Sequence, residues 1–99
     1  MKTKAEKNLF IASHEYFEAE LRKGTDDAYV YDEDGNMDRV NYYNIADLWP
    51  LVVKYDIEFL RGQNFHARHS KSNIFRNHED PIEAIVDCVI EVIKAQEGE

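Results

Sequence analysis

Residues 80–93 read DPIEAIVDCVIEVI, and this stretch decides the fold expected for the chain. Asp80 is a typical helix cap, and Pro81 suits the first helical position, where a backbone N–H is not needed. Acidic residues at four-residue spacing interrupt an apolar stripe, as on a helix with one buried face. The stripe contains Ile82, Ile85, Val86, Val89 and Ile93, widened by Cys88, Ile90 and Val92. We therefore predict a long C-terminal helix that is the central packing element of an α+β domain.

A second helical pattern occupies the N-terminal quarter. Between Ala5 and Lys23, the residues Phe10, Phe17 and Leu21 recur at helical spacing, with acidic residues on other faces. Gly24 follows as a stop, because glycine adopts a left-handed capping conformation without strain. We predict one amphipathic helix over residues 5–23, with His14 partly buried and hydrogen-bonded beside its apolar residues.

Two β-prone stretches each surround a turn signal. The first runs from Tyr29 to Tyr43 around Asp34-Gly35-Asn36, where glycine and asparagine tolerate the positive φ of a tight turn. In the second, residues 55–60 and 65–69 alternate apolar and polar side chains on either side of Gly62. We predict two hairpins, and a loop over residues 70–79 that Phe75 fixes to the core.

The first turn, DEDGNMD at residues 32–38, begins like an EF-hand calcium loop. Asp32, Asp34 and Asn36 fit the first, third and fifth positions. The sixth position is Met37 instead of glycine, and the twelfth is Tyr43 instead of glutamate. We interpret the carboxylates as a solvated turn and predict no specific calcium binding.

Between the hairpins, the sequence predicts a short helix near residues 46–54. Asn44 or Asp47 can cap it, and Pro50 is tolerated best if it lies in the first turn. Trp49 lies in the apolar run of this segment, so we predict that it is buried as a core anchor.

The composition fits one domain spanning residues 1–99. The chain has 43% apolar and 12% aromatic residues, enough for one core. The expected fold class is α+β: a single small domain of two β-hairpins, an N-terminal helix, a short middle helix and a long C-terminal helix, without an internal repeat. The lone Cys88 forms no internal disulfide and is expected to be a buried, inert thiol. With no signal segment and no membrane-length apolar run, we expect a cytoplasmic location.

The formal net charge of -8 is unevenly distributed. Residues 61–78 are basic, and they lie between the acidic segments 24–60 and 79–99. A net acidic chain is repelled by phosphate backbones, so nucleic acid is not the favoured partner. Arg68 is expected to pair with Glu58 or Asp56 across the second hairpin. The candidate binding residues are the basic Arg61, Arg68, Lys71 and Arg76 and the acidic Asp32, Asp34 and Asp38.

No residue pattern indicates catalysis. His66, His69 and His78 cluster in the basic segment, but on a strand His66 and His69 point to opposite faces and do not share a metal. A glycine-rich phosphate loop and a Ser-His-Asp pattern are both missing. We predict a protein that is not an enzyme and has no cofactor or metal.

The segment from Asn41 to Val53, NYYNIADLWPLVV, resembles the NinX-like family of small temperate-phage proteins. Ala46, Asp47, Trp49 and Pro50 match that family's Ala-Asp-x-Trp-Pro motif, whereas Tyr43 stands where the family has cysteine. The family's closing helix begins with Asn-Pro, which is similar to Asp80-Pro81 here. The resemblance covers about residues 41–95 and implies a phage accessory protein without an assigned activity.

Three hypotheses for the function remain open. The first is a small non-enzymatic accessory protein that binds a host or phage macromolecule, most simply a protein, in the bacterial cytoplasm; a homodimer is also open. The second is an acidic mimic that presents phosphate-like charge to a nucleic-acid-binding protein, through Asp26, Asp27, Asp32, Glu33, Asp34 and Asp38. The third is direct nucleic-acid contact through residues 61–78.

Overall fold

The computed structural model describes residues 3–97 of the chain, and this part contains three helices and two three-stranded antiparallel sheets. In chain order the elements are α1 (Lys4–Glu15), β1 (Glu18–Leu21), β2 (Ala28–Tyr31), β3 (Met37–Val40), α2 (Ile45–Lys54), β4 (Ile57–Arg61), β5 (Phe65–His69), β6 (Phe75–His78) and α3 (Pro81–Glu97). The predicted α+β class, with its N-terminal, short middle and long C-terminal helices, is confirmed. Each predicted hairpin has a third strand in addition.

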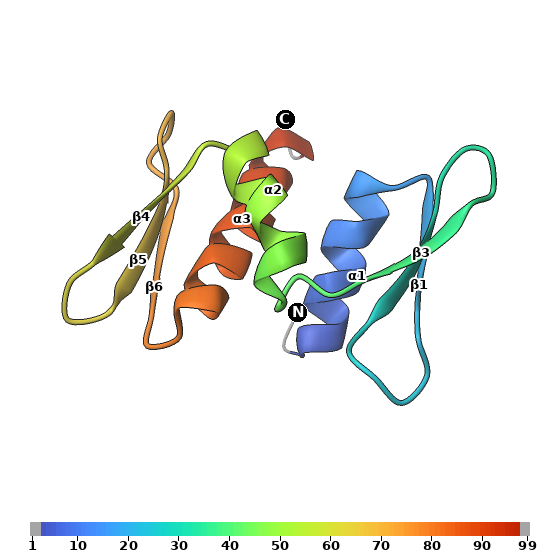
Figure 1. Cartoon of the computed structure of the whole chain (residues 1–99). Coiled ribbons are helices and arrows are strands. Elements are labelled where there is room, and N and C mark those ends of the chain that lie inside the picture. The colour runs from blue at the N-terminus through green and yellow to red at the C-terminus, as the bar shows by residue number, and fades with distance from the viewer. Residues whose placement is uncertain (1–2, 98–99) are drawn as a thin grey trace.

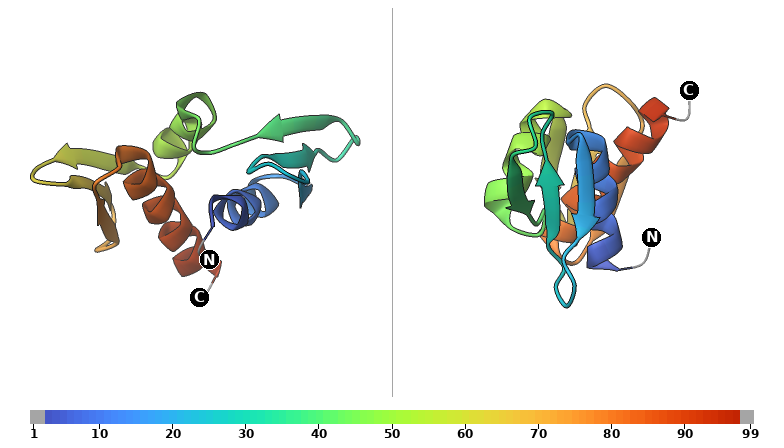
Figure 2. Two further views of the ribbon diagram at one scale, coloured as in Figure 1. Left: turned by 90° about the horizontal axis from the view of Figure 1, so that it is seen from below. Right: turned by 90° about the vertical axis from the view of Figure 1, so that its right-hand side faces the viewer.

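The helices form a middle layer with one sheet on either side (Figure 1). α1 packs against β1 and β2, α3 packs against β5 and β6, and the two helices meet in the centre. α2 packs on α3 and β4 and lies in front of α3 in Figure 1. For residues 3–97, the two views of Figure 2 show that no helix covers the outer face of either sheet.

α3 is the central packing element, as predicted. It begins at Pro81, and the Asp80 side chain accepts a 2.9 Å hydrogen bond from the Ile82 N–H. Its buried residues are Ala84, Ile85, Val86, Cys88, Val89, Ile90, Val92 and Ile93. They pack with residues of both sheets and of α1 and α2 in one hydrophobic core.

The N-terminal helix is shorter than predicted, because α1 ends at Glu15 and Tyr16 is already extended. The stretch Phe17–Leu21 reads FEAEL, which alternates apolar and acidic residues with the period of a strand. In the structure, Glu18–Leu21 pairs with β2 as an edge strand. Gly24, with φ +81°, belongs to the β1–β2 turn and does not cap a helix.

The predicted loop over residues 70–79 is also wrong, because it contains β6. Strand β6 pairs with β5, with Phe75 opposite Arg68 and Arg76 opposite Ala67. Phe75 does not fix this segment to the core: it is 48% exposed and stacks on His66 at 5.2 Å between ring centroids. Alternation was hard to detect because FRNH contains a single apolar residue.

Both predicted hairpins are confirmed. In the first, Gly35 has φ +81°, and the Asp32 carboxylate accepts hydrogen bonds from the Asp34 and Asn36 N–H groups. In the second, β4 and β5 pair around Gly62, with Glu58 opposite Arg68. The acidic stretch at residues 32–38 is therefore a turn held by its own side chain.

The order of elements occurs twice, although the sequence indicates no repeat. Both β1–β2–β3–α2 and β4–β5–β6–α3 consist of three antiparallel strands followed by a helix. The central strand of each sheet carries a fully buried alanine, Ala28 or Ala67. Within residues 3–97, no helix is long and apolar enough to cross a membrane.

Candidate protein-interaction surface

α2 is apolar on nearly all sides, but the chain covers only one of them. The helix begins after Asn44, whose side-chain oxygen accepts a 3.1 Å hydrogen bond from the Ala46 N–H; Asn44, rather than Asp47, is thus the cap. Leu48, Leu51 and Val52 are buried. Pro50 lies in the middle of the helix instead of its first turn, on the exposed side.

The exposed side of α2 forms a continuous apolar strip, which we call the α2 face; it consists of Ile45, Ala46, Trp49, Pro50 and Val53. Ile45, Trp49 and Val53 follow one another at four-residue spacing and are 51%, 56% and 64% exposed. The prediction that Trp49 is a core anchor is wrong, because α3 and β4 cover the opposite side of the helix.

The α2 face carries no charge of its own. The charged residues of α2 are Asp47 and Lys54, and both have partners inside the chain. An Asp47 carboxylate oxygen accepts a 3.0 Å hydrogen bond from the Asn41 N–H, and Lys54 Nζ lies 2.8 Å from Glu15 Oε1. Helices that are apolar on all sides are normally buried. The exposed side of α2 is as apolar as a protein interface, but no part of the described chain covers it.

A pocket adjoins the α2 face, between α2, the end of α1 and β3. Its cavity of about 340 Å³ is lined by Glu15, Tyr16, Val40, Tyr42, Asp47, Pro50 and Leu51, and we call it the acidic pocket. Its lining contains two carboxylates and no cation. Pro50 belongs to both the pocket and the α2 face, so the two form one surface.

The groups around the acidic pocket produce a negative field. The pKa of the Tyr16 phenol is raised by burial and then by the charges of Asp38, Asp47 and Glu15. The Glu15 side chain is only 9% exposed; it accepts a 2.6 Å hydrogen bond from the Tyr55 hydroxyl and pairs with Lys54. Lys54 is not part of the pocket lining, so its charge balances Glu15 from outside.

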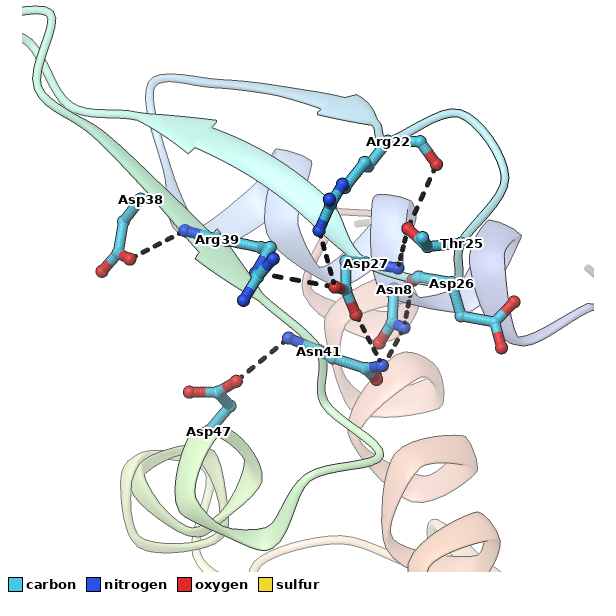
Figure 3. Close-up of polar contacts among 9 residues, drawn as sticks. All are labelled: Asn8, Arg22, Thr25, Asp26, Asp27, Asp38, Arg39, Asn41 and Asp47. Carbon is cyan, nitrogen blue, oxygen red and sulfur yellow. Dashed lines mark hydrogen bonds and ion pairs between the residues drawn. The ribbon is translucent and has the colours of Figure 1, made fainter.

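A buried hydrogen-bond network holds α2 in place relative to the first sheet (Figure 3). Asn8 of α1 is fully buried and donates to the Asp26 carbonyl (2.7 Å) and to Asn41 Oδ1 (2.9 Å). It also accepts a 2.8 Å hydrogen bond from the Tyr42 N–H. Asn41 in turn donates its N–H to Asp47, and this contact fixes one wall of the acidic pocket.

The basic residues proposed for binding mostly have acidic partners. The predicted pair of Arg68 with Glu58 is confirmed at 2.8 Å. Lys71 lies 3.0 Å from Asp56, and Arg76 lies 3.0 Å from Glu91 of α3. Within residues 3–97, Arg61 has no carboxylate within 4.0 Å, and its guanidinium lies over the Phe65 ring. Three of these four charges are thus largely neutralised.

The acidic candidates do not gather on one surface. Asp32 and Asp34 lie in the β2–β3 turn, whereas Asp26 and Asp27 lie in the β1–β2 turn, at the other end of the strands. The pKa of Asp32 is lowered by its hydrogen bonds from the Asn36 side chain and backbone. Asp38 lies on β3 and accepts a 2.7 Å hydrogen bond from the Arg39 N–H, and Asp27 binds Arg39 and Asn41.

The remaining candidate groups have structural environments. His14 contacts Glu97 at 2.7 Å, so its predicted hydrogen bond is confirmed, but the residue is exposed rather than partly buried. On β5, His66 contacts Asn77 and His69 contacts Ser72. Burial raises the pKa of the Cys88 thiol to about 11, and its predicted burial is confirmed. No three His, Cys, Asp or Glu side chains converge with metal-site geometry in the described residues.

Sequence reasoning identified Trp49 but assigned it to the core, and it missed the rest of this surface. Ile45 and Val53 lie four residues before and after Trp49, and this spacing could have indicated a second apolar side of the helix. The acidic pocket had no sequence signal, because its residues come from three elements.

Comparison with protein-family models, curated proteins and solved structures finds no match to the chain. The resemblance to the NinX-like family stays a prediction.

Proposed function

We propose that the chain is a small non-enzymatic accessory protein that binds another protein through the α2 face. The observation that supports this proposal is that α2, which is apolar on nearly all sides, leaves Ile45, Trp49 and Val53 more than half exposed. Tryptophan is enriched among the residues that dominate binding energy in protein interfaces, and α2 presents the single tryptophan of the chain.

The place of action is proposed from the family resemblance. The NinX-like motif implies a phage accessory protein, and a bacterial host cytoplasm is where such a protein would meet its partner. The motif residues Trp49 and Pro50 lie on the α2 face, while Ala46 extends it. A surface role for the motif fits a binding function better than a purely structural one.

The test compares capture by wild-type protein, a Trp49→Ala variant and a Phe75→Ala control from bacterial lysate. Phe75 is a similarly exposed aromatic residue, at 48%, but it lies on β6, which α3 separates from α2 in Figure 1. We expect a defined set of captured proteins that persists at high salt, is lost with Trp49→Ala and is retained with Phe75→Ala. Capture that is unaffected by Trp49→Ala would contradict the proposal.

Self-association is the other possible use of the α2 face. Two copies would bring together net charges of -8 each, and α2 is only about 15 Å long, which is short for the interface of a stable dimer. We therefore favour a different protein as the partner. Sedimentation over a range of concentrations distinguishes the two, because a dimer that dissociates with Trp49→Ala would make the face a self-interface.

A further inference from the structure

We infer that the partner of the α2 face inserts a basic side chain, lysine or arginine, into the acidic pocket. This inference rests on the proposed function and specifies the chemistry of the partner. A segment that covers Trp49 and Pro50 passes the mouth of the pocket, because Pro50 forms part of both. The partner therefore combines apolar residues for the α2 face with a cation beside them.

The uncompensated charge of the pocket favours a cation as the occupant. Glu15 and Asp47 line it from two elements, and none of its lining residues is basic. Both Glu15 oxygens lie within 3.0 Å of Lys54 Nζ, so Glu15 is already balanced. Among the described residues Asp47 has no cation within 4.0 Å, and it supplies the uncompensated charge of the pocket. The surrounding segment, residues 24–60, is the most acidic of the chain. An anion or an acidic segment would meet repulsion here, whereas a lysine or arginine would form charge-assisted hydrogen bonds.

The walls of the pocket suit the same occupant. Tyr16, which is 36% exposed, provides aromatic surface, which attracts ammonium and guanidinium groups. Val40, Pro50 and Leu51 line the pocket and accommodate the methylene stem of a long side chain. The cavity of about 340 Å³ lies at the lower end of the range of roughly 300–1,000 Å³ for small-molecule pockets. One long side chain is thus a better match than a large ligand.

The two carboxylates are held in place before any partner arrives. Asp47 accepts a hydrogen bond from the Asn41 backbone, and Asn41 is fixed by the buried Asn8 (Figure 3). Glu15 is held by the Tyr55 hydroxyl at 2.6 Å and by Lys54 Nζ at 2.8 Å. Because the acceptors are already oriented, little side-chain freedom is lost when a cation binds.

The experiment selects ligands from a random library of short linear peptides against the immobilised protein. Enriched peptides are synthesised with a fluorophore, and their affinities are measured by anisotropy for wild type, Asp47→Asn, Glu15→Gln, Trp49→Ala and Phe75→Ala. Asparagine at position 47 keeps an oxygen for the Asn41 N–H and removes the charge. Glutamine at position 15 likewise keeps an acceptor for the Tyr55 hydroxyl, and thermal unfolding checks that both variants fold.

We expect the enriched peptides to carry lysine or arginine next to aromatic or aliphatic residues. Asp47→Asn should weaken binding about tenfold, as for a lost charge-assisted hydrogen bond. Replacing the peptide's basic residue by glutamine should cause the same loss, and the two changes together should cost little more than either alone. Trp49→Ala should also weaken binding, and Phe75→Ala should leave it unchanged.

The other outcomes separate the inference from the proposed function. Two outcomes overturn the inference but leave the α2 face as a binding site. In the first, the peptides require Trp49 but show no preference for basic residues. In the second, they bind Asp47→Asn and Glu15→Gln as tightly as wild type. Peptides that bind independently of Trp49 contradict both. A selection without enriched peptides overturns the inference alone, since a folded partner could still bind the α2 face.

Discussion

Trp49 is the only tryptophan of the chain, so its fluorescence reports on one residue. Because the side chain is 56% exposed, we expect emission at long wavelength and strong quenching by acrylamide in the native protein. Trp49→Ala should change the free energy of unfolding by less than about 0.5–1 kcal/mol, as for other surface positions. Urea denaturation measures this change.

The neighbouring Leu48→Ala is the matched comparison, because Leu48 is fully buried on the other side of α2. It should cost about 2–5 kcal/mol through lost burial and a cavity. A similar cost for Trp49→Ala would place Trp49 in the core after all and remove the main support for the α2 face.

Asn8 is the one polar residue in the described chain that is fully buried, and all three of its hydrogen bonds bridge different elements. Asn8→Ala leaves the Asp26 carbonyl and the Tyr42 N–H without this partner, so we expect a loss of about 2–4 kcal/mol. The exposed Asn73 supplies the control, since Asn73→Ala should change stability by less than about 0.5 kcal/mol. Thermal and urea unfolding measure both, and near-equal values would contradict a stabilising role for the network.

At the scale of elements, Gly35 and Gly62 occupy similar hairpin turns but have different backbone requirements. Gly35 has φ +81°, whereas Gly62 does not have a positive φ, and a Cβ there would meet only the Asn64 carbonyl at 3.9 Å. Gly35→Ala should therefore cost about 1–2 kcal/mol. Gly62→Ala should be neutral, or stabilise by about 0.4–1 kcal/mol by restricting the unfolded chain. Chemical denaturation of the two variants gives the comparison, and equal effects would contradict it.

Elements with a strong local signal were predicted well. Asp80-Pro81 and the stripe after it define α3, and Asp-Gly-Asn and Gly62 locate two turns, because these features depend on neighbouring residues alone. The segments 17–21 and 75–78 were missed for different reasons. The first contains both a helical and an alternating pattern, and pairing with β2 decides between them. The second is an edge strand with four exposed residues, so it has little hydrophobic pattern.

The candidate site was less predictable than the fold. Both sides of α2 are apolar in sequence, and only the packing of α3 and β4 determines that Leu48 is buried while Trp49 is exposed. The acidic pocket depends on bringing Glu15, Tyr42 and Asp47 together, and this arrangement arises from contacts between α1, the segment after β3, and α2. Sequence spacing does not encode such a juxtaposition.

At the scale of the whole molecule, the middle layer explains why α2 has an uncovered side. α1 and α3 each cover one sheet, and together they fill the space between the sheets. α2 lies at the margin of this layer, on the side away from the start of α1 and the end of α3 in the left view of Figure 2. The core is thus completed without the α2 face, which remains available for a partner.

The burial of three tyrosines and of Cys88 in and around the core predicts that the protein loses stability at alkaline pH. Burial raises the pKa of the phenols of Tyr42, Tyr43 and Tyr55 above 10.0 and that of the Cys88 thiol from 9.0 to about 11. Each group favours its neutral form in the folded state. Their contribution is therefore complete below the unfolded pKa values of 9.0 and 10.0, and it is lost as pH rises through the folded values.

Urea unfolding between neutral pH and strongly alkaline pH should show the free energy of unfolding falling from about pH 9, more steeply above pH 10. Tyrosinate absorbance near 295 nm should rise together with unfolding for the buried phenols. Cys88→Ala should remove the part of the decrease that begins near pH 9, and Tyr42→Phe should weaken the part above pH 10. A stability that stays constant through this range would show that these groups ionise in the folded state as they do in the unfolded chain.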